Sequence, residues 1–191
     1  MLQYLVFIGA ILSLIACSSY VRSMFKGEAQ PNRISWLMWG IAPLIATLAG
    51  IASGVRLAVL PVFMSGFSPL LIFFFSFVSK KAYWKLERFD YFCGLFSILA
   101  LILWAITKNA DIAIIFAILS DGAASIPTLV KSWTNPESEN MFPFVGGLFG
   151  ASVAFFAIKE WKFSAYAFLI YLVGVNILLL FSINRGKFFK A

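Results

Sequence analysis

The chain has 191 residues, of which 62% are hydrophobic and only 12% charged, with a formal net charge of +7 and a mean hydropathy of +0.94. A soluble domain carries about 25% charged residues, so this composition excludes an ordinary soluble fold. The basic residues stand between apolar blocks rather than on one face, which argues against nucleic acid and favours anionic lipid headgroups as their partners.

The apolar blocks are long enough to be membrane spans, because about 18 or more apolar residues are needed to cross a hydrocarbon layer of about 30 Å. We predict an all-α integral membrane protein with seven transmembrane helices. In chain order they cover residues 4–24, 34–53, 57–79, 89–107, 110–133, 142–158 and 163–184.

The run that ends at Cys17 allows a second interpretation. The sequence Leu14-Ile15-Ala16-Cys17 looks like the cleavage box of a lipoprotein signal. A signal peptide also begins with a positively charged leader, and no Lys or Arg precedes Arg22. We therefore expect the first helix to be retained.

Seven helices divide the 15 basic residues unequally between the two sides of a membrane, with eleven on one side and four on the other. Cytoplasmic loops collect Lys and Arg, so this asymmetry predicts a multi-pass protein of the cell membrane with its N-terminus outside and its C-terminus in the cytoplasm. The eleven are Arg22, Lys26, Arg33, Lys80, Lys81, Lys85, Arg88, Lys131, Arg185, Lys187 and Lys190.

The helical layout of residues 1–83 is repeated in residues 109–191. A shift of 108 residues superimposes the two segments without a gap and places Asn32 on Asn140 and Gly66 on Gly174. This pattern predicts two three-helix units joined by a linker helix within residues 84–108. Three helices reverse the direction of the chain and a fourth restores it, so the units are expected to be parallel bundles related by an axis along the membrane normal.

The clearest motif follows the fifth predicted helix. Pro127 lies near the end of that helix and is followed by the Lys-Ser pair of the motif, Lys131-Ser132. The next helix begins with the aromatic run Phe142-Pro143-Phe144. With the three-plus-one-plus-three plan and the outside N-terminus, these residues resemble the SWEET and PQ-loop superfamily of transporters. In that resemblance Pro127 is the motif proline, and Thr128 stands where glutamine is typical.

The resemblance implies a carrier that opens its two halves alternately around a central site. It does not extend to the sugar-binding asparagine of the sugar-transporting members, which follows a proline early in the third helix of each unit. Here Val62 follows Pro61, and no Pro-Asn pair opens the last helix. The substrate class is therefore expected to differ from sugar.

Asp121 is the leading candidate for a functional residue because it lies near the centre of the fifth predicted helix. A carboxylate at that depth costs about 2.5 to 3.5 kcal/mol, so it normally faces a cavity or a partner. We expect Asp121 to bind a cationic or polar substrate or to take up a proton during transport. The alternative is a packing role, with the carboxyl held by Ser120, Ser125 or a backbone carbonyl.

Asn176 and Ser68 occupy equivalent positions, each two residues after a glycine in the third helix of its unit. The repeat predicts that they face each other at mid-membrane, where the substrates of repeat-built transporters bind. The alternative is a hydrogen bond between helices, worth about 0.6 kcal/mol.

Trp36 and Trp39 open the second helix of the first unit, as Phe142 and Phe144 do in the second unit. Their rings could stack on a substrate. Aromatic residues also anchor helices at the membrane interface, and anchoring is the interpretation that the sequence favours.

Pro127 and Pro43 are candidate hinges, because a proline inside a helix removes one backbone hydrogen bond and bends the axis. Prolines are also common in membrane helices without such a role.

The sequence has no histidine, and its two cysteines, Cys17 and Cys93, have no Cys-x-x-Cys spacing, so we expect neither a metal site nor a cofactor. An enzyme is disfavoured because Asp121 is the only deep acid. The sequence predicts a transporter of a small polar solute, passive or linked to protons, with a membrane receptor or accessory protein as the alternative. It leaves the oligomeric state open.

Overall fold

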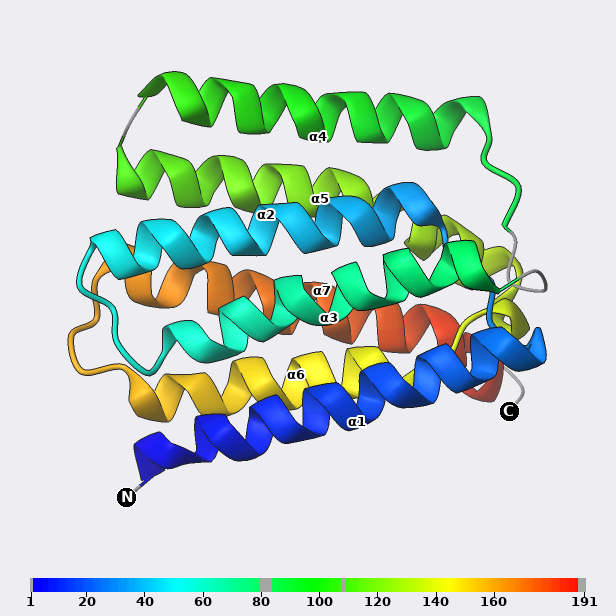
Figure 1. Ribbon diagram of the computed structural model, residues 1–191, viewed down its shortest axis with the longest axis horizontal. Coiled ribbons are helices and arrows are strands. Elements are labelled where there is room, and N and C mark those ends of the chain that lie inside the picture. Colours follow the sequence, from blue (N-terminus) through cyan, green and yellow to red (C-terminus); the bar gives the residue numbers. More distant parts are fainter. Residues whose placement is uncertain (1, 80–83, 108, 189–191) are drawn as a thin grey trace.

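The computed structural model describes residues 2–79, 84–107 and 109–188, and those residues form an all-helical chain (Figure 1). Lys80, Lys81, Lys108 and Lys190 lie outside the described residues, as do the predicted domain boundaries at 83 and 108. The elements are η1 Leu2–Tyr4, α1 Leu5–Lys26, α2 Arg33–Ala52, α3 Val59–Val78, α4 Arg88–Thr107, α5 Ala110–Thr134, η2 Pro136–Ser138, α6 Phe142–Ala154, η3 Phe155–Ala157 and α7 Phe163–Phe188.

These helices agree with the predicted ranges to within about four residues, with one difference in type. The sixth predicted helix ends as a separate 3₁₀ turn, η3, after α6. Among the described residues, five helices, α1, α2, α3, α5 and α7, are long and apolar enough to cross a membrane, and α6 with η3 forms a shorter apolar stretch. Length and composition therefore indicate a multi-pass membrane protein.

The distribution of side chains is inverted relative to a soluble protein. Large apolar residues cover the outside of the helices, among them Phe74, Phe92 and Ile106. Polar residues such as Asp121 and Asn176 are buried. This arrangement fits lipid as the solvent, because lipid accepts apolar surface and offers no hydrogen bonds.

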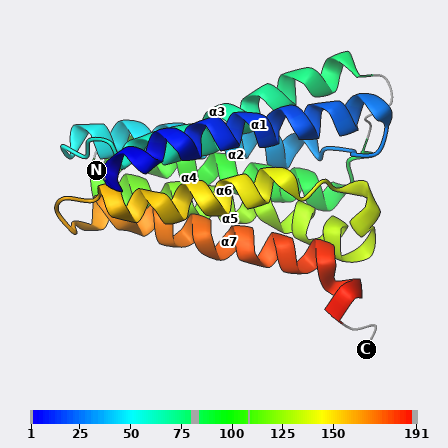
Figure 2. The ribbon, with the colours of Figure 1, turned by 90° about the horizontal axis from the view of Figure 1, so that it is seen from below.

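The helices pack in an order that differs from their order in the chain. α3 packs against both α1 and α2, and α7 packs in the same way against both α5 and α6. Between these groups, α1 packs on α6 and α2 packs on α5, while α4 lies on the outside, mainly against α5 (Figures 1 and 2).

The bundle has two distinct ends. α1 begins at one end and α7 finishes at the other (Figure 1). We call the first the N-terminal end, which also holds the α2–α3 and α6–α7 loops. We call the second the C-terminal end, which also holds the α1–α2 and α5–α6 loops.

Repeat-equivalent asparagines start the second helix of each group. The Asn32 side chain accepts hydrogen bonds from the backbone amides of Ile34 and Ser35, at 3.1 and 3.3 Å, and so caps α2. The Asn140 side chain accepts a bond from the amide of Phe142 at 2.9 Å, where α6 begins. Such side-chain oxygens satisfy amides that the first turn of a helix leaves without partners.

Glycine lets α2 and α3 approach closely. A Cβ added at Gly66 would lie 2.9 Å from the backbone oxygen of Gly40, too close for a real contact. Its repeat equivalent in α7, Gly174, has no such neighbour within 4 Å. Of the two equivalent glycines, only Gly66 is therefore needed for a close approach of neighbouring helices.

We expect Gly66→Ala to lower the stability of the protein by about 1 to 3 kcal/mol, because a backbone oxygen cannot move aside as a side chain can. Gly174→Ala is the matched control and is expected to be neutral or slightly stabilising, since alanine favours a helix. Thermal unfolding of both variants in one detergent measures the difference. Equal melting temperatures would contradict the close approach of α2 and α3.

Candidate functional site

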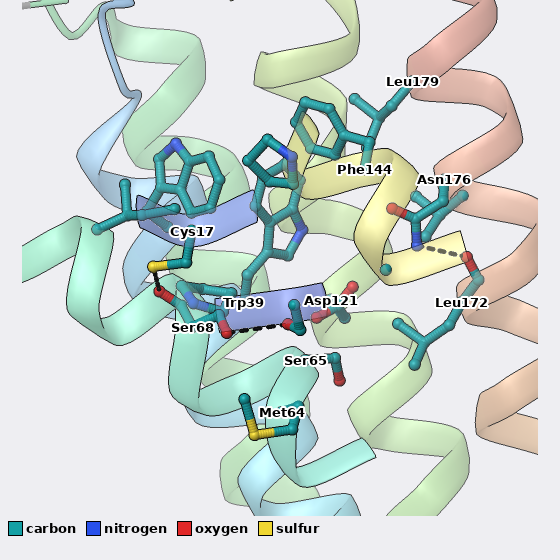
Figure 3. Close-up of a pocket in the computed structure, with 17 residues that line it drawn as sticks. Cys17, Trp39, Met64, Ser65, Ser68, Asp121, Phe144, Leu172, Asn176 and Leu179 are labelled. Carbon is teal, nitrogen blue, oxygen red and sulfur yellow. Dashed lines mark hydrogen bonds between the residues drawn. The ribbon is translucent and has the colours of Figure 1, made fainter. Parts of the chain in front are cut away.

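A cavity of about 80 Å³ lies among six helices near mid-bundle (Figure 3). Its described lining residues come from α1, α2, α3, α5, α6 and α7, so both three-helix groups contribute to its wall. They are Ser13, Cys17, Trp36, Trp39, Met64, Ser65, Ser68, Pro69, Ile72, Asp121, Pro143, Phe144, Gly147, Leu172, Val175, Asn176 and Leu179.

Asp121 lines this cavity from α5 and is only 3% exposed. Its Oδ2 accepts a hydrogen bond of 2.7 Å from the Tyr171 hydroxyl of α7. Neither predicted serine is the recorded partner, since the Ser125 hydroxyl donates to the Gly122 carbonyl at 2.7 Å and Ser120 Oγ has no described hydrogen bond. The carboxyl therefore joins α5 to α7 at the cavity wall.

Ser68 and Asn176 both line the cavity and lie on opposite sides of it (Figure 3). The Ser68 and Ser13 hydroxyl oxygens are 3.1 Å apart, which links α3 to α1. The Asn176 amide donates to the Leu172 carbonyl of its own helix at 2.7 Å. A Cβ added at Gly147 would lie 2.9 Å from Asn176 Oδ1, so a larger residue at 147 would displace the Asn176 amide.

Trp36, Trp39 and Phe144 form an aromatic cluster in the cavity wall. The centroids of the Trp36 and Trp39 rings are 5.2 Å apart, and the Phe144 centroid lies 6.0 Å from that of Trp39. All three side chains are buried, so interfacial anchoring is the wrong interpretation for them, whereas Phe142 is 53% exposed and fits it. The sequence could not separate these residues because they open the same two helices.

The remaining predicted residues lie outside the described lining of this cavity. Ser125 is buried in α5, one turn beyond Asp121. Pro127 is buried in α5, and Pro43 is buried in α2. Each proline lies within a continuous helix, as a hinge residue would.

A buried ion pair closes the C-terminal end of the bundle. Lys131 Nζ lies 2.6 Å from Glu139 Oε1, and the two side chains are 1% and 0% exposed. The Tyr20 hydroxyl donates to the other Glu139 oxygen at 2.9 Å, and Lys131 also donates to the backbone oxygen of Gln30. Lys131 further lies 4.8 Å from the centroid of the Trp84 ring. We call these five residues the ion-pair cluster.

The N-terminal end is closed differently. Small apolar residues meet there, namely Val6, Ala58 and Ala157. Beside them, a polar cavity of about 430 Å³ lies between the α2–α3 and α6–α7 loops. In its wall, the hydrogen bond and charge of Lys162 lower the pKa of Glu160. The N-terminal end therefore has a cavity that water can enter, whereas the C-terminal end has a buried ion pair.

Tyr171 and Tyr20 are the residues that sequence reasoning missed as partners of buried acids. Under the 108-residue shift Tyr171 falls on Phe63, so the repeat gives no signal for its hydroxyl. Under the same shift Tyr20 falls on Thr128, so the repeat does not indicate a tyrosine partner there either. Both partnerships join residues at least 50 positions apart, which spacing alone does not reveal.

Comparison of the chain with protein-family models, with curated proteins and with solved structures finds no match. Within the described ranges, His, Cys, Asp and Glu side chains form no group of three or more that could hold a metal ion.

Removing one member of the ion-pair cluster should be costly, because the other charge is left buried and unpaired. We expect Lys131→Met or Glu139→Gln to lower the stability by about 3 to 5 kcal/mol. The control is Lys26→Met, which breaks the exposed pair with Glu28 and should change stability by less than about 1 kcal/mol.

Thermal unfolding of the three variants in one detergent compares the two pairs. Losses of similar size at Lys131 and Lys26 would show that the buried pair does not hold the C-terminal end together.

Proposed function

We propose that this protein carries a small polar solute across the cell membrane by alternating access, in the manner implied by its resemblance to the SWEET and PQ-loop transporters. The observation that carries the proposal is a central cavity with a buried carboxyl, Asp121, in a wall built by six helices from both three-helix groups. Such a cavity can bind a solute between two halves that then move against each other.

In this proposal the protein has seven membrane spans in a three-plus-one-plus-three plan. Residues 1–83 and 109–191 are the two units, and residues 84–108 hold the linker helix. The packing supports this plan, because α3 packs on both α1 and α2 just as α7 packs on both α5 and α6. Across the two groups, α1 packs on α6 and α2 packs on α5. The equivalent asparagines also support it, because the side chains of Asn32 and Asn140 each accept a hydrogen bond from a backbone amide two residues later, at the start of α2 and of α6.

The described conformation is closed by small apolar residues at the N-terminal end and by the ion-pair cluster at the C-terminal end. The ion-pair cluster seals that end, while a smaller cavity of about 20 Å³ shares Ser13 and Asn176 with the central cavity and reaches Gly9 and Gly150, toward the N-terminal end. Transport then requires the contacts of this cluster that join the two units to open, namely Tyr20 with Glu139 and Gln30 with Lys131.

Pro127 and Pro43 are the hinges of this movement. Each lies within a helix at the interface between the units, since α2 of the first unit packs on α5 of the second. The backbone hydrogen bond that each proline omits lets its helix bend without breaking a further bond. Asp121 takes up a proton when no cation occupies the cavity, which would link transport to protons.

We base the orientation on the described basic residues, of which Arg22, Lys26, Arg33, Arg88, Lys131 and Arg185 stand in the helix turns at the C-terminal end of the bundle. We place that end in the cytoplasm and the N-terminus outside. To test this orientation, a cysteine is added at one or the other end of the chain, and intact cells are treated with a membrane-impermeant thiol reagent. Labelling of the N-terminal cysteine alone is expected, and labelling of both would contradict the orientation.

The alternative function is a receptor or accessory protein with the same fold, which binds the solute and does not move it. Binding without flux in proteoliposomes would select that function. In either case the protein is not proposed to be an enzyme.

We expect Asp121→Asn to reduce solute flux at least about tenfold and to remove its pH dependence, because the amide keeps the shape of the carboxyl and loses its charge and its titration. The solute is first chosen by thermal stabilisation of the purified protein across sugars, amino acids, nucleosides, vitamins and amines. Its flux is then measured in proteoliposomes at several pH values.

The matched control is Asp111→Asn, which removes a carboxylate from the exposed first turn of the same helix. This variant should transport like the parent protein. Unchanged flux and unchanged pH dependence in Asp121→Asn would remove Asp121 from the transport mechanism.

A further inference from the structure

The central cavity has a charge that the protein does not balance. Asp121 is the one ionisable acid among its described lining residues, and no Lys or Arg is among them. The recorded partner of the carboxyl is a neutral hydroxyl, that of Tyr171. A carboxylate in such surroundings attracts a cation strongly, because a buried charge without a counter-charge is costly.

From this we infer that the cavity binds a small organic ammonium ion, with its positive charge at Asp121 and its carbon groups against the Trp36–Trp39–Phe144 cluster. The inference rests on the proposed function and names the class of solute that the carrier takes.

Three polar side chains of the cavity wall direct their hydrogen-bond donors to backbone oxygens. The thiol of Cys17 donates to the Ser68 carbonyl at 3.5 Å, and the hydroxyl of Ser65 donates to the Val62 carbonyl at 2.7 Å. The Asn176 amide likewise donates to the Leu172 carbonyl. Since these donors are directed to backbone oxygens, the groups left toward the cavity include the Asn176 carbonyl oxygen and the Asp121 carboxylate. Acceptors of this kind suit the N–H groups of an ammonium ion.

The aromatic cluster favours an organic cation over a bare metal ion. Cations are attracted to the faces of tryptophan and phenylalanine rings, by about 0.5 to 1 kcal/mol at exposed sites and about 2 kcal/mol or more when water is excluded. The described cation–ring contacts of the protein pair Arg33 with Phe77, Lys131 with Trp84 and Arg185 with Trp133. None of these involves the cavity rings, so those rings stay available to a ligand.

Two pairs of matched compounds test the charge requirement. Choline is compared with 3,3-dimethylbutan-1-ol, in which carbon replaces the charged nitrogen, and ethanolammonium is compared with ethylene glycol. Binding to the purified full-length protein is measured by calorimetry. At least one cation should bind about tenfold or more tightly than its neutral match.

Asp121→Asn should remove most of that preference, whereas Asp111→Asn should keep it. Trp39→Leu should weaken binding of the preferred cation roughly three- to thirtyfold, which corresponds to the loss of one desolvated cation–ring contact. If Asp121→Asn does not fold, Trp39→Leu and Asn176→Leu still test the site, because both leave the bond from Tyr171 to Asp121 in place.

The inference is wrong if neither cation binds more tightly than its neutral match, or if Asp121→Asn keeps the full preference. Flux separates this failure from a failure of the proposed function. A neutral solute that crosses proteoliposomes in an Asp121-dependent manner would keep the carrier and reject the ammonium site. A cation that binds through Asp121 and never crosses would keep the ammonium site and select the receptor.

Discussion

Lipid offers no hydrogen bonds, and this constraint explains where the polar residues of the chain lie. Between the two ends of the bundle, carboxyl, amide and hydroxyl groups turn inward, and the outward faces carry large apolar side chains. The polar groups of such an interior need hydrogen-bond or charge partners, which come either from the protein or from a ligand. Asp121 has such partners only in part, because a neutral tyrosine supports it and no cation of the cavity wall balances it.

The two ends of the bundle are closed by different kinds of contact. At the C-terminal end, the buried Lys131–Glu139 pair belongs to the second group of helices and is held to the first group by Tyr20 and by the backbone oxygen of Gln30. At the N-terminal end, small apolar residues meet beside a polar cavity, and no buried charge must be separated there. The two ends therefore differ in the contacts that hold the helices together there.

The sequence predicted the helices well because apolar blocks and capping residues are local signals, as Asn32 shows at the start of α2. It also selected Asp121, because a carboxyl at the centre of an apolar helix is visible in the chain, and Ser68 and Asn176, because their positions in the repeated unit match. The structure brings all three to one cavity. It misjudged Trp36 and Trp39, since a helix end does not say whether a ring faces lipid or protein. It missed Tyr171 and the Lys131–Glu139–Tyr20 contacts because these depend on how distant helices pack.

Side-specific labelling of Ser68→Cys, in a protein whose Cys17 and Cys93 are replaced by alanine, tests most directly whether the cavity is a transport site. A membrane-impermeant thiol reagent is applied to reconstituted protein from one side and then from the other, with Leu119→Cys on the exposed face of α5 as the control. Alternating access predicts that residue 68 reacts from each side and residue 119 from neither. Reaction of residue 68 from one side alone, whatever solute is present, would contradict it.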